Sequence, residues 1–194
     1  MPRLHPSLPH CLALAAALWL GPVGRVGAQG APVGPRTAET LAVLDVLFVG
    51  ELANAIQPAD SLVAPEASVK LRGNFAAAPG VTVVDSARLA AALASPSVAA
   101  AAGGKPCALV ADCLRAVQTA TGARWVAAGK LTKISSLVWI YSARLLDGRT
   151  GSLVMDDEYE VKGTAGDMAE IGARVFARRA VARMQAVPPR AASR

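Results

Sequence analysis

The sequence predicts one α/β domain, a three-layer-like fold in which helices pack on a mixed five-stranded sheet. The chain has 194 residues, which suits one domain of about 100–200 residues. Segments with strand periodicity alternate with helical segments in its first two-thirds. Three consecutive strand patterns and one long helix then follow. The predicted order is therefore β-α-β-α-α-β-β-β-α.

The N-terminal residues 1–28 are predicted to be a signal peptide. Arg3 supplies the positive charge, Cys11–Leu20 is a short apolar stretch, and Val26–Ala28 offers small residues for cleavage. This apolar stretch is too short to cross a bilayer, which needs about 20 residues. We therefore expect no transmembrane anchor after cleavage. The rest divides into a flexible lead-in, the α/β domain and a disordered tail, at residues 29–39, 40–187 and 188–194.

The five predicted strands are apolar or alternating segments bounded by turn residues. They lie at residues 41–48, 81–84, 124–131, 137–146 and 152–162. The first is almost continuously apolar, which is typical of a strand buried on both faces. Asp45 interrupts it, and we expect this carboxylate at a strand end, bonded to backbone donors. In the last strand, Leu153 and Met155 share an apolar face, and charged residues occupy the other face.

Four helices are predicted from their periodicity and end signals, at residues 65–77, 85–93, 107–121 and 165–185. Pro65 suits a first helical turn, and Asp85 suits an N-terminal cap. Gly122 follows the third helix as a terminating glycine. Residues 95–106 are expected to form a loose connection without secondary structure.

Charge and histidine content exclude several classes of function. The net charge is +6, but like charges do not form long runs, so no nucleic-acid-binding tail is expected. Both histidines, His5 and His10, lie in the predicted signal peptide. Without them the mature chain lacks the usual general base, the Ser-His and Cys-His pairs, and imidazole metal ligands. We therefore expect a protein that is not an enzyme and that uses no cofactor.

Cys107 and Cys113 are the two cysteines that remain after cleavage. In an oxidising compartment such a pair most simply forms a disulfide. Residues six apart on one helix lie about 9 Å apart along its axis, which is too far for this bond. Cys107 must then lie in a loop that folds back over the helix start. A redox-active or metal-binding pair is the alternative, although the spacing is not Cys-x-x-Cys.

Two clusters of charged residues are candidate sites. Asp156, Glu158 and Glu160 share one strand face and are weak candidates for a metal site, whereas a solvated strand face is the preferred interpretation. Four arginines crowd the last helix and form two pairs spaced four apart. They are Arg174 with Arg178, and Arg179 with Arg183. Ordinary helix electrostatics, with partner contacts as an addition, is the interpretation favoured for them.

Several segments resemble a family of exported bacterial proteins catalogued as a domain of unknown function, DUF2380. They are Cys107–Cys113, Thr121–Val126, Gly129–Leu137 and Asp147–Gly151. That family in turn resembles the N-terminal α/β domain of TolB and the periplasmic domain of CsgG. The corresponding segments here are Leu41–Asp45, Val83–Asp85 and Gly122–Gly129. The resemblance implies an assembly or interaction role in the periplasm and no catalytic residues.

The leading hypothesis is thus a periplasmic, non-enzymatic accessory or interaction module that binds an envelope or periplasmic protein. Lys130, Lys133 and Ser135 are the candidate partner surface, because exposed polar positions host much of protein function. The alternative is a periplasmic protein that binds a small ligand or a metal, at the acidic strand or at strand ends near Asp45 and Asp85. A thiol-based enzyme at the cysteine pair is the third hypothesis.

Overall fold

The structure, a computed structural model, describes residues 38–50 and 56–187. Its strands are β1 (Glu39–Val43), β2 (Leu47–Gly50), β3 (Val81–Val83), β4 (Trp125–Lys133), β5 (Val138–Asp147) and β6 (Ser152–Lys162). Its α-helices are α1 (Val63–Ala76), α2 (Ser86–Leu93), α3 (Pro96–Ala102), α4 (Ala111–Thr121) and α5 (Ala165–Ala186). Two short 3-10 helices complete it, η2 (Pro58–Leu62) and η3 (Cys107–Leu109).

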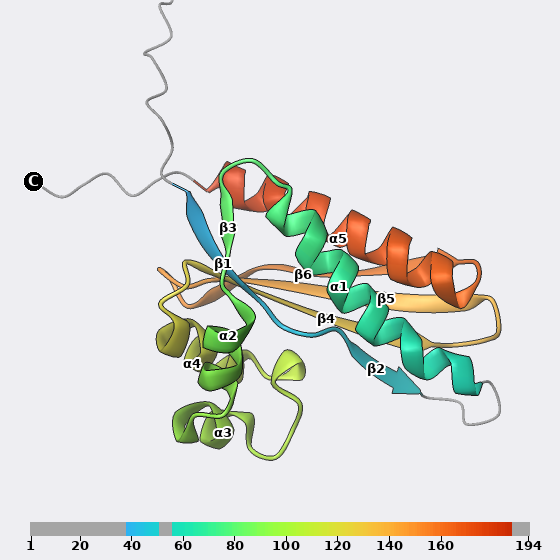
Figure 1. The fold of residues 1–194 in the computed structure, drawn as a ribbon, viewed down its shortest axis with the longest axis horizontal. Helices are drawn as coiled ribbons and strands as arrows, with labels where there is room; N and C mark the ends of the chain where they lie inside the picture. The colour runs from blue at the N-terminus through green and yellow to red at the C-terminus, as the bar shows by residue number, and fades with distance from the viewer. Residues whose placement is uncertain (1–37, 51–55, 188–194) are drawn as a thin grey trace, which may run out of the picture. The chain divides into compact units, whose positions relative to one another are not determined.

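The strands form one mixed sheet in the order β3-β1-β4-β5-β6, with β2 also paired to β4 (Figure 1). β1 pairs in parallel with β3 and β4, and β2 also pairs in parallel with β4. β4, β5 and β6 pair antiparallel. The predicted α/β class and the mixed sheet are therefore confirmed.

The sheet has six described strands instead of five, because the first predicted strand is broken at Asp45. Its two halves, β1 and β2, pair with successive parts of β4. Asp45 lies at this break, as expected for a strand end, but its carboxylate does not bind backbone donors. It is exposed and forms an ion pair with Arg72 of α1. The backbone N–H of Val46 donates instead to the Ser68 hydroxyl, at 2.8 Å.

The expected loose connection at residues 95–106 contains the helix α3, so that prediction is wrong. Ser95 caps it, because its hydroxyl accepts the Val98 N–H, and Pro96 occupies its first position. Gly103 ends it with a φ of +58°, a conformation that favours glycine. The predicted 107–121 helix is divided into η3 and α4, whereas Asp85 caps α2 as predicted.

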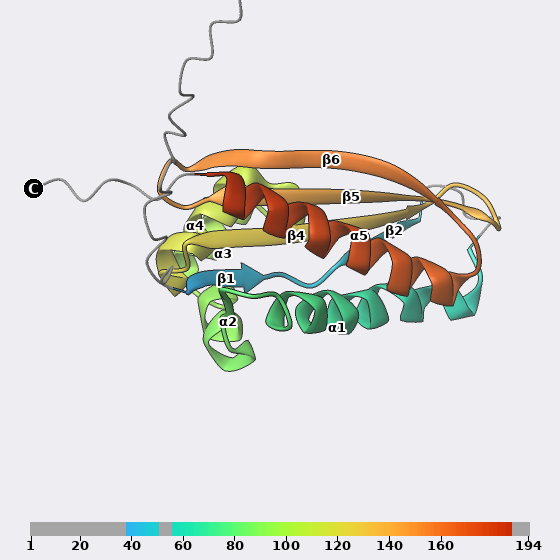
Figure 2. The same cartoon turned by 90° about the horizontal axis from the view of Figure 1, so that it is seen from above.

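Each face of the sheet has its own hydrophobic core. α1 and α5 cover one face over its whole length, and Phe75 of α1 meets Phe176 of α5 edge to face. α2, α3 and α4 cover one end of the opposite face, where Leu114 and Val117 of α4 are fully buried. Figure 1 shows the sheet almost edge on between these layers, and Figure 2 shows α1 and α5 side by side along it.

One more prediction, that Leu153 and Met155 share a face, is wrong because the β5–β6 pairing contains a bulge. Leu145 pairs with Met155, but the next residue, Leu146, pairs with Leu153. This shift places Leu153 in the α4-side core while Met155 lies in the α1–α5 core, so they do not share a face as predicted.

The predicted signal peptide, the predicted tail and all but the last two residues of the lead-in lie outside the described residues and stay predictions. Glu39, assigned to the lead-in, begins β1. Within the described ranges, no helix combines the length and the apolar character needed to cross a membrane.

Candidate functional site

The candidate site is the half of one sheet face that no described α-helix covers, although the short helix η3 borders it. The helices α2–α4 pack on Ala42, Leu44 and Val126, all near one end of the sheet. Further along the same face, alternation of side chains points nine residues to the side opposite α1 and α5. They are Leu47, Val49, Lys130, Thr132, Val138, Ile140, Ser142, Glu158 and Glu160, called here the open half-face. In Figure 1 it lies below the right half of the sheet.

The open half-face is apolar on the β2 side and charged on the β6 side. The pairing of the strands arranges its residues in rows that run across β2, β4, β5 and β6. One row consists of Leu47, Lys130, Ser142 and Glu158, and the next consists of Val49, Thr132, Ile140 and Glu160. The apolar side chains on β2 and β5 are half-buried, Thr132 and Ser142 between them are buried, and the glutamates on β6 are exposed. Apolar surface with a charged rim is thus available to another molecule.

The polar groups of this face are partly paired with one another. The Ser142 hydroxyl donates to the Glu158 carboxylate at 2.7 Å. Beside them a small cleft of about 40 Å³ lies between η3 and the sheet, lined by Lys130, Ser142, Glu158 and others. Among the described residues the Lys130 ammonium has no ion-pair or hydrogen-bond partner. Lys130 is therefore free to bind an acidic group from outside.

The three predicted partner-surface residues do not lie together. Lys130 lies on the open half-face, but Lys133 points to the opposite side and is only 3% exposed. Its ammonium binds the Asp60 carboxylate of η2 at 2.6 Å and lies 5.3 Å from the centre of the Trp139 ring. Lys133 is thus part of the core and not of the surface. The prediction that it contacts a partner protein is therefore wrong. The physical reason is strand alternation, which places residues 130 and 133 on opposite faces.

Asp60 is held in its charged form by this pair. Burial alone would raise its pKa. Hydrogen bonds from the Gln57 N–H and the Lys133 ammonium, together with the Lys133 charge, outweigh burial and bring the pKa below its usual value. η2 is thereby fastened to the end of β4.

Ser135 lies in the turn between β4 and β5. Its hydroxyl accepts the backbone N–H of Val138 at 3.1 Å and that of Leu137 at 3.4 Å. This is a turn-stabilising role, and a contact role for Ser135 stays a prediction.

The acidic strand shares one face, as predicted, but each of its candidate metal ligands has a partner within the protein. Arg144 donates to Asp156 at 2.9 Å, Ser142 donates to Glu158, and Lys162 pairs with Glu160 at 3.1 Å. No group of three or more potential ligands close enough to hold a metal ion occurs in residues 38–50 and 56–187. Metal binding here stays a prediction that this geometry does not strengthen.

Cys107 and Cys113 form a disulfide with a Cα–Cα distance of 5.2 Å. Cys107 lies in η3, ahead of α4, and the chain turns at Val110, so the first cysteine folds back over the helix start. Cys113 is fully buried and packs in the core beneath α3. The bond fastens the segment that bounds the small cleft.

The sequence did not indicate Leu47, Val49 and Ile140 as site residues. Their apolar character fits a buried strand equally well, and only the absence of a described helix above them makes them a surface. The sequence contained one signal for this surface, which is the length of the predicted helices compared with the length of the predicted strands.

No protein-family model matches the chain, and no curated protein matches it significantly. Assignment to the family of unknown function therefore stays a prediction.

The chain is similar to several solved structures of low identity. One is the C-terminal domain of LpoB from Salmonella enterica, with 18% identity, 68% of this chain and 87% of that chain covered, and a TM-score of 0.48. Another is TolB from Acinetobacter baumannii, with 12% identity, 79% and 30% covered, and a TM-score of 0.46. A third is PelC from Paraburkholderia phytofirmans, solved as a dodecamer, with 14% identity, 76% and 89% covered, and a TM-score of 0.38. TolB is also named in the sequence resemblance, but likenesses this weak do not establish a function.

Proposed function

We propose that this protein is an exported, non-enzymatic accessory module that binds another protein of the cell envelope through the open half-face. The observation that carries the proposal is a sheet face that is covered at one end and bare at the other within the described chain. Val49 and Ile140 on the bare end are apolar residues that leave part of their surface in water. Burying them against a partner would be favourable by about 25 cal/mol for each Å² of apolar surface.

The composition of the open half-face is that of a protein interface. Protein interfaces have an apolar centre and a polar rim. Here Val49, Ile140 and Val138 supply the centre, and Lys130 and Glu160 supply the rim. Lys130 adds a charge without an internal partner, which would favour an acidic group on the bound protein.

Two further observations support export and a role without catalysis. The described chain contains a disulfide, which forms and persists in oxidising compartments. It contains no histidine, and its two thiols are used in that bond. Ser142, the hydroxyl beside the cleft, therefore has no imidazole to take its proton.

Site-specific photocrosslinking in the producing cell tests the proposal. A photoreactive amino acid is placed at Lys130 or Ile140, and as controls at Arg88 or Leu93, exposed positions on α2. We expect one envelope protein to be crosslinked from the two sheet positions and not from α2. The purified partner should then bind the mature protein, and Ile140→Asp should weaken this binding about tenfold or more because it places a charge in the buried centre.

A lack of crosslinks from the open half-face would remove the proposal. Equal crosslinking from α2 would do the same, because it would show non-specific proximity. Far-ultraviolet circular dichroism of Ile140→Asp is the control for folding.

A further inference from the structure

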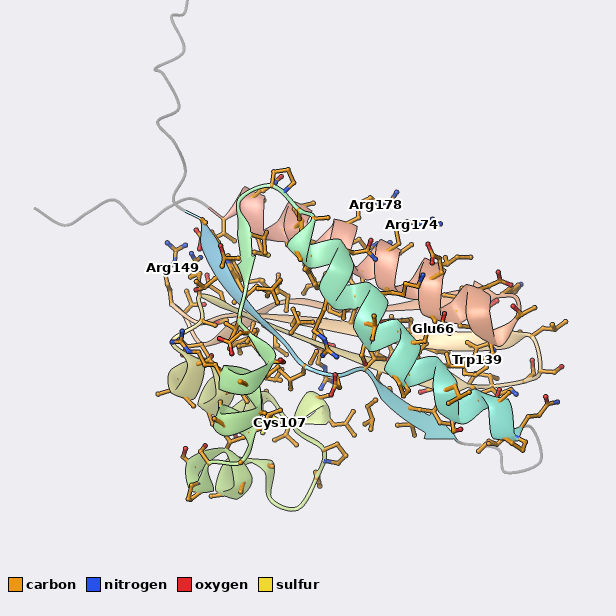
Figure 3. The ribbon with its side chains drawn as sticks, viewed as in Figure 1. Glu66, Cys107, Trp139, Arg149, Arg174 and Arg178 are labelled. Carbon is orange, nitrogen blue, oxygen red and sulfur yellow. A yellow bond between two sulfur atoms is a disulfide. The ribbon has the colours of Figure 1, made fainter. Side chains whose placement is uncertain are left out.

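Three of the four arginines of α5 lie on two different sides of the helix. Arg179 faces β6, where it binds Asp157 at 3.0 Å and lies over the Tyr159 ring. Arg174 and Arg178 lie on another side of α5, where they line a groove together with Asn74 of α1. Figure 3 shows these two side chains extending from the outer side of α5, away from the sheet. Arg179 thus has different surroundings from the predicted pair Arg174 and Arg178.

Arg174 and Arg178 border a groove of about 400 Å³ between α1 and α5. The groove is lined by Asn74, Ala78, Arg174, Ala177, Arg178, Val181, Ala182 and Gln185. Its floor is apolar and shallow, because Ala177 and Ala182 are small. Its walls carry two cations and two amides, and no acidic side chain lines it.

The groove carries one positive charge, on Arg178, that the described residues do not neutralise. Arg178 has no ion-pair partner among the described residues. The acid nearest along the helix, Glu170, pairs with Lys70 of α1 at 3.0 Å, and Lys70 and, to a lesser extent, Arg174 lower its pKa. That ion pair joins the two helices one turn before Arg174, so it lies next to the groove without occupying it.

We propose that the α1–α5 groove is a docking site for an acidic helical segment of a partner protein. This is a second surface, on the face of the sheet opposite the open half-face, and it does not depend on the proposed function. The nature of the occupant follows from charge complementarity. Because the groove is lined by two arginines and no acidic residue, it favours a ligand that carries carboxylates.

The geometry favours a helix as the occupant. Residues four apart on a helix have Cβ atoms about 6 Å apart, so Arg174 and Arg178 form a short cationic row. Two carboxylates three or four positions apart on a second helix have the same spacing and can each bind one guanidinium. The apolar face of that helix would rest on Ala177 and Val181, as in other helix-in-groove complexes.

The sequence that follows α5 does not supply the ligand. Residues 188–194 contain two arginines and no acid, so they lack the complementary charge. The charges therefore favour a segment of a partner protein over residues 188–194.

The test uses the mature protein and a fluorescent helical peptide of about 16 residues, long enough to hold helix in solution. The peptide carries two glutamates four apart beside an alanine and leucine face. Fluorescence anisotropy should show saturable binding that falls at least about tenfold in the double variant Arg174→Glu with Arg178→Glu, because like charges then face each other. A peptide with lysines in place of the glutamates should bind this variant and not the unaltered protein.

A matched control makes the same change of charge elsewhere. Arg88→Glu with Arg183→Glu alters α2 and a part of α5 outside the groove, and it should leave peptide binding unchanged. Ile140→Asp on the open half-face should also leave it unchanged. Circular dichroism and urea unfolding would show whether each variant is folded.

Three outcomes would overturn the inference. The acidic peptide would fail to bind, or it would bind both double variants equally, or the lysine peptide would not bind the variant in which Arg174 and Arg178 are changed. Cosedimentation with phosphatidylglycerol vesicles that depends on Arg174 and Arg178, in the absence of peptide binding, would assign the groove to a lipid surface instead. Self-association that depends on the same arginines, without peptide binding, would assign it to a second copy.

Discussion

Removing the carboxylate of Asp60 should destabilise the protein far more than removing an exposed carboxylate with a similar ion pair. Asp60 and Lys133 are each about 3% exposed and joined at 2.6 Å. With Asp60 changed to alanine, the Lys133 ammonium would be left buried without a counter-charge. Breaking a buried pair in this way costs about 3–5 kcal/mol. The Gln57 N–H would also lose its acceptor.

The expected loss for Asp60→Ala is therefore about 3–5 kcal/mol in the free energy of unfolding. It would be measured by urea unfolding of the mature protein at pH 7, followed by circular dichroism. For a domain of this size, 1 kcal/mol lowers Tm by about 2–4 °C, so the thermal midpoint should fall by roughly 6 °C or more. The double variant with Lys133→Met should recover most of this loss, because no unpaired charge then remains in the core.

The Lys70–Glu170 pair provides the matched control. It also joins a lysine to a carboxylate, at 3.0 Å, but its side chains are 45% and 52% exposed. Glu170→Gln should leave the free energy of unfolding almost unchanged, since solvent screens such exposed pairs. A loss below about 1 kcal/mol for Asp60→Ala, or no recovery with Lys133→Met, would refute the claim that an unpaired buried charge dominates.

Three further predictions concern packing, the disulfide and pH. Gly172→Ala should cost about 1–3 kcal/mol in urea unfolding, because the new Cβ would lie 2.3 Å from Cδ2 of Tyr141. Changing Cys107 and Cys113 to serine should cost about 2 kcal/mol, from the freedom that the unfolded chain regains. Burial would raise the pKa of Asp147, but hydrogen bonds from Arg124 and from the Arg149 N–H, with their charges, lower it. The stability that Asp147 contributes is therefore present above about pH 4 and lost as the pH falls through its lower folded-state pKa.

Each of these has its own control. Gly73 lies exposed on α1, and a Cβ added there would have no other atom within 4 Å, so Gly73→Ala should stabilise by about 0.5–1 kcal/mol. If it destabilises as much as Gly172→Ala, the clash with Tyr141 is not the cause. A reducing agent should lower the stability of the unaltered protein and not that of the double serine variant. For Asp147→Asn, the difference from the unaltered protein should shrink below about pH 4, and a difference that stays constant contradicts the pKa argument.

The sequence predicted those strands and helix ends that depend only on residues close to them in the chain. Alternation in residues 137–146 and 152–162 reflects strands whose side chains point in turn to the two faces of the sheet, and the cap at Asp85 needs only its own neighbours. The break at Asp45 was missed because it depends on Arg72 of α1 and on the Ser68 hydroxyl, both distant in the chain.

The candidate site was predicted less well than the fold, for the same reason. Lysine is usually found at the surface, and the burial of Lys133 depends on its pairing with Asp60, which lies 73 residues earlier in the chain. Nothing near Lys133 in the sequence reveals that partner. The groove between α1 and α5 likewise could not be predicted without knowing that these helices lie side by side. The sequence shows only that Arg174 and Arg178 are four residues apart.

The open half-face follows from the lengths of the elements. β5 has 10 residues and extends about 33 Å. α5, with 22 residues, also extends about 33 Å and can cover a strand from end to end. α4 has 11 residues and extends only about 16 Å, so on the other face it can cover half of the same strand. The bare half is thus set by helix length, and it lies on the sheet face opposite to the α1–α5 groove. Because the packed sheet separates the two surfaces and they share no residue, a change on one should not alter binding at the other.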